Sequence, residues 1–492
     1  MLVLKFGGTS VGSAQMIRNV YAIVKDRLPK RPLVVVSAHG GVTDMLIRAA
    51  NEAVSGGSSI EAIEKRHLEI VHQLDLDEAL VSRHLRELEV LLKGITLVKE
   101  LTPRTLDYVL SFGERLSART VAAYFTKAGI AAVAVDAYDL GMITDSNFGQ
   151  ARPLPEAEHL IAFNVKRYEA LPIITGYIGK DRNGNVTTLG RNGSDLTATA
   201  VGAAVGAEEV QIWGDTDGVM TADPTLLPEA MPISLMSFDE AGELAYYGGR
   251  IHPSSLVPAM AKRIPVRLLN TRKPTGPGTL IMEKWQPGQG NGKLFAPLLP
   301  FKNGTLSSSA GKSAQPQDGT EGRGKPELAV KAVVYKESVF LLNIASTRML
   351  MHHGFMAKLF EIFGRHGVVI DMISTSEVSV SLTTDADIGL EPAVREISEF
   401  AEVTVESEKA IVCVVGEGIR TTPGVLADIF VAVRAAGANV HMVSQGASRI
   451  NVAFVVDNEQ ILPVVSSLHK RFFPGTAVPP EAPSAEKKAA FA

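Results

Sequence analysis

The sequence has very little cysteine and no long apolar run. A single cysteine among 492 residues, Cys413, excludes an intramolecular disulfide and a cysteine-rich metal site. Its apolar neighbours in residues 410–415 (AIVCVV) favour a buried structural thiol over a nucleophile. No apolar run approaches the ~20 residues of a membrane span. The start of the chain lacks the layout of a signal peptide. We therefore expect a cytoplasmic protein with no membrane partner.

An excess of one charge is also missing. The chain carries 53 acidic and 49 basic residues, and its formal net charge is −4. This balance argues against a general nucleic-acid-binding protein. The content of 46% hydrophobic and 21% charged residues is typical of a globular protein. A chain of this length is too long for one hydrophobic core and predicts two to four domains.

Three common nucleotide-binding signatures are absent as well. The sequence contains no G-x-x-x-x-G-K-[ST] motif and no H-R-D plus D-F-G set. The first expected strand is not followed by G-x-G-x-x-G. These absences argue against a P-loop enzyme, a protein kinase and a dinucleotide-binding fold.

What the chain does have, at its start, is a strand followed by a glycine turn. The apolar residues 2–6 lead into Gly7 and Gly8, and residues with a helical period follow. Glycine lets the backbone approach a ligand closely, and the amides at a helix start can face an anion. Lys5 would place a cation beside that anion. We interpret this stretch as a phosphate cradle; the alternative is an ordinary turn with an exposed lysine.

The same pattern recurs along residues 1–283, where strands alternate with helices. It predicts an α/β domain with an open, mainly parallel sheet sandwiched by helices. In such sheets ligands bind at the carboxyl ends of the strands. Cations, hydroxyls and carboxylates gather at these ends: Lys5, Thr43, Arg191, Ser194, Glu114, Asp195 and Asp215. The set suits phosphoryl transfer from a nucleotide, with Mg²⁺ held mainly by the phosphates and no dedicated protein metal site.

The second half of the chain has a different organisation. Residues 284–328 are rich in Gly, Ser, Gln, Lys and Pro, which predicts a flexible linker. Two small α+β repeats follow at residues 329–405 and 406–473. Residues 474–492 are rich in Pro, Ala and Lys and predict a disordered tail.

Five ordered motifs make a resemblance specific. They are residues 5–11 (KFGGTSV), 111–114 (SFGE), 187–195 (TTLGRNGSD), 213–218 (WGDTDG) with 221–224 (TADP), and 370–379 (IDMISTSEVS). In order and spacing they resemble the aspartokinases of the amino-acid kinase family, over nearly the whole chain apart from the linker and tail. The two small repeats then resemble ACT domains, the regulatory modules of this family.

The resemblance implies ATP-dependent phosphorylation of the β-carboxylate of L-aspartate, the first step towards lysine, threonine and methionine. Lys5 would contact the transferring phosphoryl group, and Asp195 would orient the site. Arg191 would hold the substrate α-carboxylate and Glu114 its ammonium group. Thr43 and Ser194 would contact the substrate.

Positions matched to the nucleotide site depart from the family pattern in part. Gly7, Gly8, Gly214, Asp215, Met220 and Arg250 would meet ATP. Met220 stands where many members have Tyr, Arg250 where Lys is usual, Thr225 where Arg is common, and Gly214 where Thr is frequent. These differences concern ATP contacts and leave the aspartate side unchanged.

The resemblance also implies an effector site in the first ACT repeat, with lysine as the first choice of effector and threonine as the second. The matching positions are Met349, Gly354, Phe355, Met356, Asp371, Ser376 and Glu377. ACT modules usually bind effectors across a dimer, so we expect a homodimer through these domains, possibly a dimer of dimers.

Two other functions stay open at this point. One is another amino-acid kinase acting on glutamate or N-acetylglutamate, although such enzymes lack the paired ACT region. The other is an amino-acid-sensing binding protein with a decayed kinase half, which the departures on the nucleotide side motivate.

Overall fold

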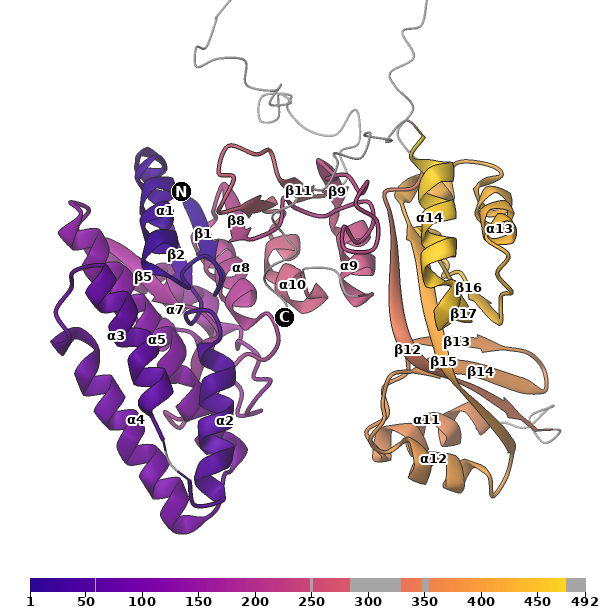
Figure 1. Ribbon diagram of the computed structural model, residues 1–492, viewed down its shortest axis with the longest axis horizontal. Helices are drawn as coiled ribbons and strands as arrows, with labels where there is room; N and C mark the ends of the chain where they lie inside the picture. The colour runs from indigo at the N-terminus through magenta and orange to yellow at the C-terminus, as the bar shows by residue number, and fades with distance from the viewer. Residues whose placement is uncertain (58, 248–250, 284–328, 347–353, 475–492) are drawn as a thin grey trace, which may run out of the picture.

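The computed structural model describes residues 1–57, 59–247, 251–283, 329–346 and 354–474. A unit built from residues 1–283 lies beside a unit built from residues 329–474 (Figure 1). We call them the catalytic unit and the regulatory unit, after the roles that the resemblance implies. The predicted linker, and all but the first residue of the predicted tail, lie outside the described residues.

An eight-stranded sheet organises the catalytic unit, in the order β3-β5-β2-β1-β8-β10-β11-β9. Its strands are β1 (Leu2–Phe6), β2 (Leu33–Val36), β3 (Ala132–Val135), β5 (Leu171–Thr175), β8 (Glu209–Gly214), β9 (Leu235–Ser237), β10 (Val266–Asn270) and β11 (Thr279–Met282). Only the β10–β11 pairing is antiparallel, so the predicted open, mainly parallel sheet is confirmed. A small sheet of β4 (Ile143–Thr144), β6 (Ile178–Asp181) and β7 (Val186–Thr188) carries the predicted hairpin.

Helices cover both faces of the large sheet because successive strand residues point to opposite sides. Leu4 of β1 packs with α1 and α5, whereas Val3 packs with α8. The helices of this unit are α1 (Ala14–Lys25), α2 (Val42–Val54), α3 (Glu61–Gln73), α4 (Ala79–Val98), α5 (Pro103–Lys127), α6 (Ala137–Leu140), α7 (Glu156–Asn164), α8 (Gly193–Val205), α9 (Phe238–Tyr246) and α10 (Pro253–Ala261). The helices α3 and α4 pack with α2 and α5 in a separate cluster.

The regulatory unit contains one six-stranded antiparallel sheet, in the order β13-β14-β12-β15-β17-β16. Its strands are β12 (Ala332–Ala345), β13 (Met372–Thr375), β14 (Ser379–Thr384), β15 (Glu402–Val415), β16 (Met442–Ser444) and β17 (Asn451–Asp457). The two central strands, β12 and β15, are 14 residues long and run through both repeats. At one edge of this sheet, β13 begins at Met372.

The regulatory sheet has a different partner on each face. Its own helices cover one face: α11 (Phe355–Arg365), α12 (Leu390–Ile397), α13 (Val425–Ala435) and α14 (Ile461–Phe472). Residues of the other face, among them Cys413 and Val455, share a cluster with Phe238 and Leu244 of α9 in the catalytic unit. The prediction of a buried structural cysteine is confirmed, because Cys413 is free and fully buried.

Candidate active site and effector site

A buried ion pair joins the end of β1 to the start of α8. The ammonium Nζ of Lys5 lies 2.6 Å from Oδ1 of Asp195, and the two residues are 9% and 5% exposed. Alternation along β1 places Lys5 on the same side as Val3, which is the side that α8 covers. Asp195 stands in the first turn of α8, where the helix dipole favours a negative charge. The interpretation of Lys5 as an exposed lysine is therefore wrong.

The turn before α8 contains one non-glycine residue in the left-handed conformation, at the position that precedes the helix. Asn192 adopts the left-handed region with φ 56°, and its Nδ2 donates a 3.3 Å hydrogen bond to Oδ2 of Asp195. Arg191 is exposed, whereas Ser194 is buried beside Gly176. Asp195 thus pairs with Lys5, and the guanidinium of Arg191 lies at the surface.

The first glycine turn, which follows β1, touches the second glycine turn, residues 38–41 after β2, at the carboxyl edge of the sheet. The amide of Gly40 donates a 3.0 Å hydrogen bond to the carbonyl oxygen of Gly8. The amide of Gly7 donates a 3.1 Å hydrogen bond to the carbonyl oxygen of Trp213. A Cβ added at Gly8 would lie 3.1 Å from the carbonyl oxygen of Ala38. A side chain there would require the two turns to move apart by a few tenths of an ångström.

One hydroxyl of the first turn does not face the site. The Oγ of Ser10 is buried and lies 2.7 Å from Oγ1 of Thr271, just after β10. That hydrogen bond ties the start of the chain to the far part of the sheet. Thr9, by contrast, is exposed.

Glu114 reaches the second turn from the middle of α5. Its Oε1 accepts a 3.1 Å hydrogen bond from the amide of Ala38, and the residue is only 4% exposed. Burial raises the pKa of Glu114 to about 8, although the bond from Ala38 and the charge of Lys5 oppose the shift. The alternative of a surface charge on a helix is wrong for Glu114. Thr43 lies half-buried in the first turn of α2, just after this glycine turn.

Asp107 supports the site from two helical turns before Glu114, and our reading of the sequence missed it. Its carboxylate accepts hydrogen bonds from the amides of Gly149 and Thr188 and from the Thr188 hydroxyl, at 2.7–3.0 Å. Burial raises the pKa of Asp107. A lone acidic residue on the apolar face of a predicted helix is the signal that could have identified it.

The positions matched to the nucleotide site lie at and after the end of β8. Gly214 is buried and accepts a hydrogen bond from the amide of Thr271, whereas Asp215 is exposed. Met220 is half-buried and forms a backbone bridge with Pro232. Arg250 lies outside the described residues.

The segment after Met220 contacts the regulatory unit, which the sequence did not indicate. Oγ1 of Thr221 lies 2.9 Å from Nε2 of His469 in α14, and its carbonyl accepts a 2.8 Å hydrogen bond from Val333. The hydroxyl of Tyr335 donates a 3.3 Å hydrogen bond to Asp223. A part of the expected nucleotide motif is thus attached to β12 and α14 of the regulatory unit.

The described positions matched to the effector site belong to the start of α11 and to β13 with the residues on either side of it. Gly354 and Phe355 begin α11, with Gly354 at φ 90°, and Met356 is half-buried. Ser376 and Glu377 are exposed in the turn between β13 and β14. Met349 lies outside the described residues.

Asp371 of this set makes contacts that the sequence did not predict. Its side chain is 2% exposed, and its Oδ1 lies 2.7 Å from Nζ of Lys336. The same oxygen accepts a 2.8 Å hydrogen bond from the hydroxyl of Tyr246 at the end of α9. Its other oxygen, Oδ2, is buried and has no hydrogen-bond partner among the described residues.

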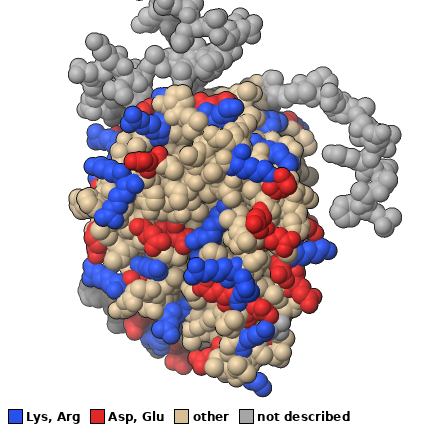
Figure 2. All heavy atoms as spheres, turned by 90° about the vertical axis from the view of Figure 1, so that its left-hand side faces the viewer, with Lys and Arg blue, Asp and Glu red and all other residues tan. Residues whose placement is uncertain are grey.

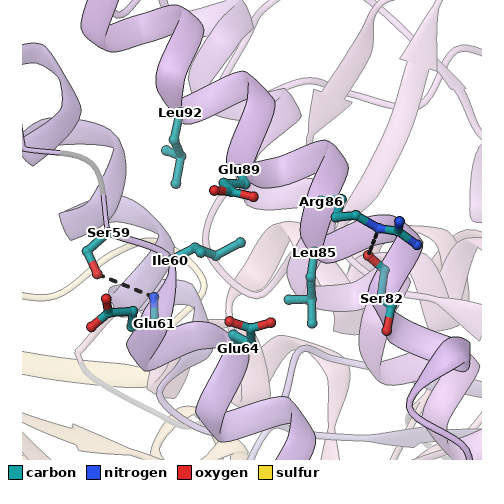
Figure 3. Close-up of a pocket in the computed structure, with 9 residues that line it drawn as sticks. All are labelled: Ser59, Ile60, Glu61, Glu64, Ser82, Leu85, Arg86, Glu89 and Leu92. Atoms are coloured by element: carbon teal, nitrogen blue, oxygen red, sulfur yellow. Dashed lines mark hydrogen bonds between the residues drawn. The ribbon is translucent and has the colours of Figure 1, made fainter.

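Two surface hollows lie away from these strand ends. One lies between α3 and α4, with Glu64 and Glu89 facing it (Figure 3). The other is lined by Arg104, Arg115 and Lys180.

Within the described residues, no three His, Cys, Asp or Glu side chains come together as a metal site. Acidic and basic side chains alternate over the face shown in Figure 2. None of the described helices has an apolar stretch long enough to span a membrane.

Comparison with protein families agrees with this architecture. The model of the amino acid kinase family matches residues 1–270, and that of the ACT domain matches residues 342–399 and 412–472. The chain is 37% identical to aspartokinase 2 of Arabidopsis thaliana, a chloroplastic protein, over 96% of this chain and 84% of the relative. It is 30% identical to the lysine-sensitive aspartokinase 3 of Escherichia coli, over 96% of this chain and 99% of the relative.

Solved structures extend the comparison to three dimensions. Escherichia coli aspartokinase III in complex with aspartate and ADP, an R-state, superposes with a TM-score of 0.77 at 29% identity, covering 96% of this chain and all of that one. The T-state of the same protein, in complex with lysine and aspartate, gives a TM-score of 0.72 at 30% identity and covers 96% and 99%. The chain therefore belongs to the aspartokinases of the amino acid kinase family.

Proposed function

We propose that this chain transfers the γ-phosphoryl group of ATP to the β-carboxylate of L-aspartate. The buried ion pair between Lys5 and Asp195 carries the proposal. It places a fixed cation between a pair of touching glycine turns and the start of α8. Glu114 approaches the same turns from α5.

The chemistry needs charge neutralisation and no general base. A side-chain carboxyl such as the acceptor ordinarily has a pKa of about 4, so it is already ionised at neutral pH. The barrier comes from bringing this anion to an anionic phosphate. Lys5 would sit on the transferring oxygens, and Asp195 would hold its ammonium in place. The amides of the glycine turns would supply further donors.

The aspartate would be held at both of its other charged groups. Arg191 is exposed, so its guanidinium fork is accessible to the α-carboxylate and suits a bidentate contact. Glu114 would bind the α-ammonium, and the arrival of a cation would favour its ionised form. Thr43 and Ser194 would complete the substrate contacts.

The nucleotide would lie on the side of β8, against Gly7, Gly8, Gly214, Asp215, Met220 and Arg250. Mg²⁺ would be held mainly by the phosphates and would neutralise part of their charge. Asp215 is exposed beside the expected phosphate position, so it could contact the ion through water. We propose the cytoplasm as the compartment.

Regulation is the second part of the proposal. Lysine, or threonine as the second choice, would bind the first ACT repeat at Met349, Gly354, Phe355, Met356, Asp371, Ser376 and Glu377. The unpaired Oδ2 of Asp371 suits an effector ammonium group. A homodimer through the ACT domains, or a dimer of dimers, would complete the site.

The test is ADP formation in the presence of ATP and Mg²⁺ with aspartate, glutamate or N-acetylglutamate as the acceptor. Turnover with aspartate alone supports the proposal, and inhibition by added lysine or threonine identifies the effector. Turnover with glutamate or N-acetylglutamate instead would overturn the choice of acceptor. Absence of turnover at saturating ATP together with intact lysine binding would favour the sensing protein with a decayed kinase half.

A further inference from the structure

Three consecutive residues of the second glycine turn each hold a different part of the site. The amide of Ala38 donates to Glu114 at 3.1 Å, and the amide of Gly40 donates to the carbonyl of Gly8 at 3.0 Å. Between them, Nδ1 of His39 lies 2.6 Å from the carbonyl oxygen of Val11. The His39 ring therefore spans from the second turn to the end of the first.

The hydrogen bond fixes the state of the His39 ring. A carbonyl oxygen only accepts, so Nδ1 must carry the proton and Nε2 its lone pair. Burial lowers the pKa of His39 to about 4, even though the bond to Val11 opposes the shift, so the ring is neutral at physiological pH. The neighbouring His67 ring, centred 5.1 Å away, is also fully buried, and its pKa is lowered well below the usual value, mainly by burial.

The first turn has little freedom around this contact. A Cβ added at Gly12 would lie 2.9 Å from the Gly8 carbonyl oxygen and 3.5 Å from the Gly40 nitrogen. The guanidinium of Arg66, from α3, donates a 2.6 Å hydrogen bond to the Gly12 carbonyl. Because the two turns are packed this closely, a shift of Val11 would move the amides of Gly7 and Gly8.

We propose that His39 is a positioning residue that keeps the first glycine turn in register with the second, so that the phosphate-facing amides and Glu114 stay fixed relative to each other. His39 is 1% exposed, so it would act through the two turns and not by direct contact with a substrate. The inference rests on the proposed function, because it assumes that the first turn receives the phosphates.

The experiment compares His39→Leu with His39→Asn. Leu fills a similar volume without a donor, whereas the Asn side-chain amide places an N–H near the position of Nδ1. We expect the Leu variant to raise KM for ATP about five- to tenfold, as the loss of one buried hydrogen bond predicts, with a smaller change in KM for aspartate. We expect the Asn variant to return KM for ATP to within about twofold of the wild type.

His67→Leu is the matched control, since neither ring nitrogen of His67 has a hydrogen-bond partner among the described residues. This variant should keep KM for ATP and KM for aspartate within about twofold of the wild-type values. The proposal is overturned if His39→Leu leaves KM for ATP unchanged, or if the Leu and Asn variants raise both KM values equally. If His39→Leu does not fold, His39→Ala serves as the donor-free variant.

Calorimetric binding of ADP separates this inference from the proposed reaction. Weaker ADP binding by the donor-free variant, with recovery in the Asn variant, supports the role of His39 whichever acid is phosphorylated. Failure of the wild type to phosphorylate aspartate would instead refute the proposed function. Equal ADP affinity in all three proteins would overturn the positioning role.

Discussion

The hydroxyl of Tyr246, at the end of α9 in the catalytic unit, donates a 2.8 Å hydrogen bond to Oδ1 of Asp371 in the regulatory unit. Nζ of Lys336 approaches the same oxygen at 2.7 Å. Tyr246 lies four residues before Arg250 in the sequence. One carboxylate of the proposed effector site is therefore hydrogen-bonded to the last residue of a helix in the catalytic unit.

Replacing Tyr246 with Phe should change inhibition and leave catalysis alone. Loss of the tyrosine hydrogen bond to Oδ1 would leave more of the Asp371 charge available to the effector ammonium proposed at Oδ2. The variant should therefore be inhibited at a lysine concentration about three- to tenfold lower. Inhibition curves at fixed ATP and aspartate measure this. If the half-inhibitory lysine concentration, kcat and both KM values all equal those of the wild type, this hydrogen bond does not affect effector binding.

Replacing Lys5 with Ala should lower kcat about a thousandfold or more, because it removes the buried cation proposed to contact the transferring phosphoryl group. Lysine binding, followed by calorimetry, should be unchanged because the effector site lies in the other unit. Retained turnover would refute the role assigned to Lys5.

The pKa of Glu114 makes aspartate binding depend on pH. Below pH 8 the carboxyl is largely protonated and neutral, so it binds an ammonium group weakly; above pH 8 it is ionised. KM for aspartate should therefore fall roughly five- to tenfold between pH 7 and pH 8.5. Glu114→Gln should raise KM and remove this dependence. A wild-type KM that stays constant over this range would contradict the assignment.

Replacing Thr221 with Val tests the contact between the units. The change keeps the shape but leaves the Met231 amide and Nε2 of His469 without the Thr221 hydroxyl. We expect a loss of about 1–2 kcal/mol in unfolding free energy and a lower Tm. Thr225→Val is the control, since Thr225 is exposed and bonds only to Asp223 nearby. Equal Tm values for the two variants would argue against a stabilising role for Thr221.

The sequence alone predicted the parts that depend on local patterns. Apolar runs followed by glycine predicted the strands that carry Lys5 and Gly214, and helical periodicity predicted α5 with Glu114. The left-handed conformation of Asn192 also agrees with its residue type, because Asn tolerates that conformation. The function was predicted from the five motifs, because they resemble those of the aspartokinases.

The tertiary structure alone decided which distant residues meet. Lys5 and Asp195 are 190 positions apart, and they pair because β1 turns Lys5 towards α8. The charged residues at the start of β15 form part of the regulatory sheet because β12 pairs with them. No local pattern in the sequence indicates this pairing. The inward hydroxyl of Ser10 and the Thr221–His469 contact have the same origin. Local sequence sets the direction of the backbone at each turn, but the order of the strands and the packing between units determine which side chains end within reach of each other.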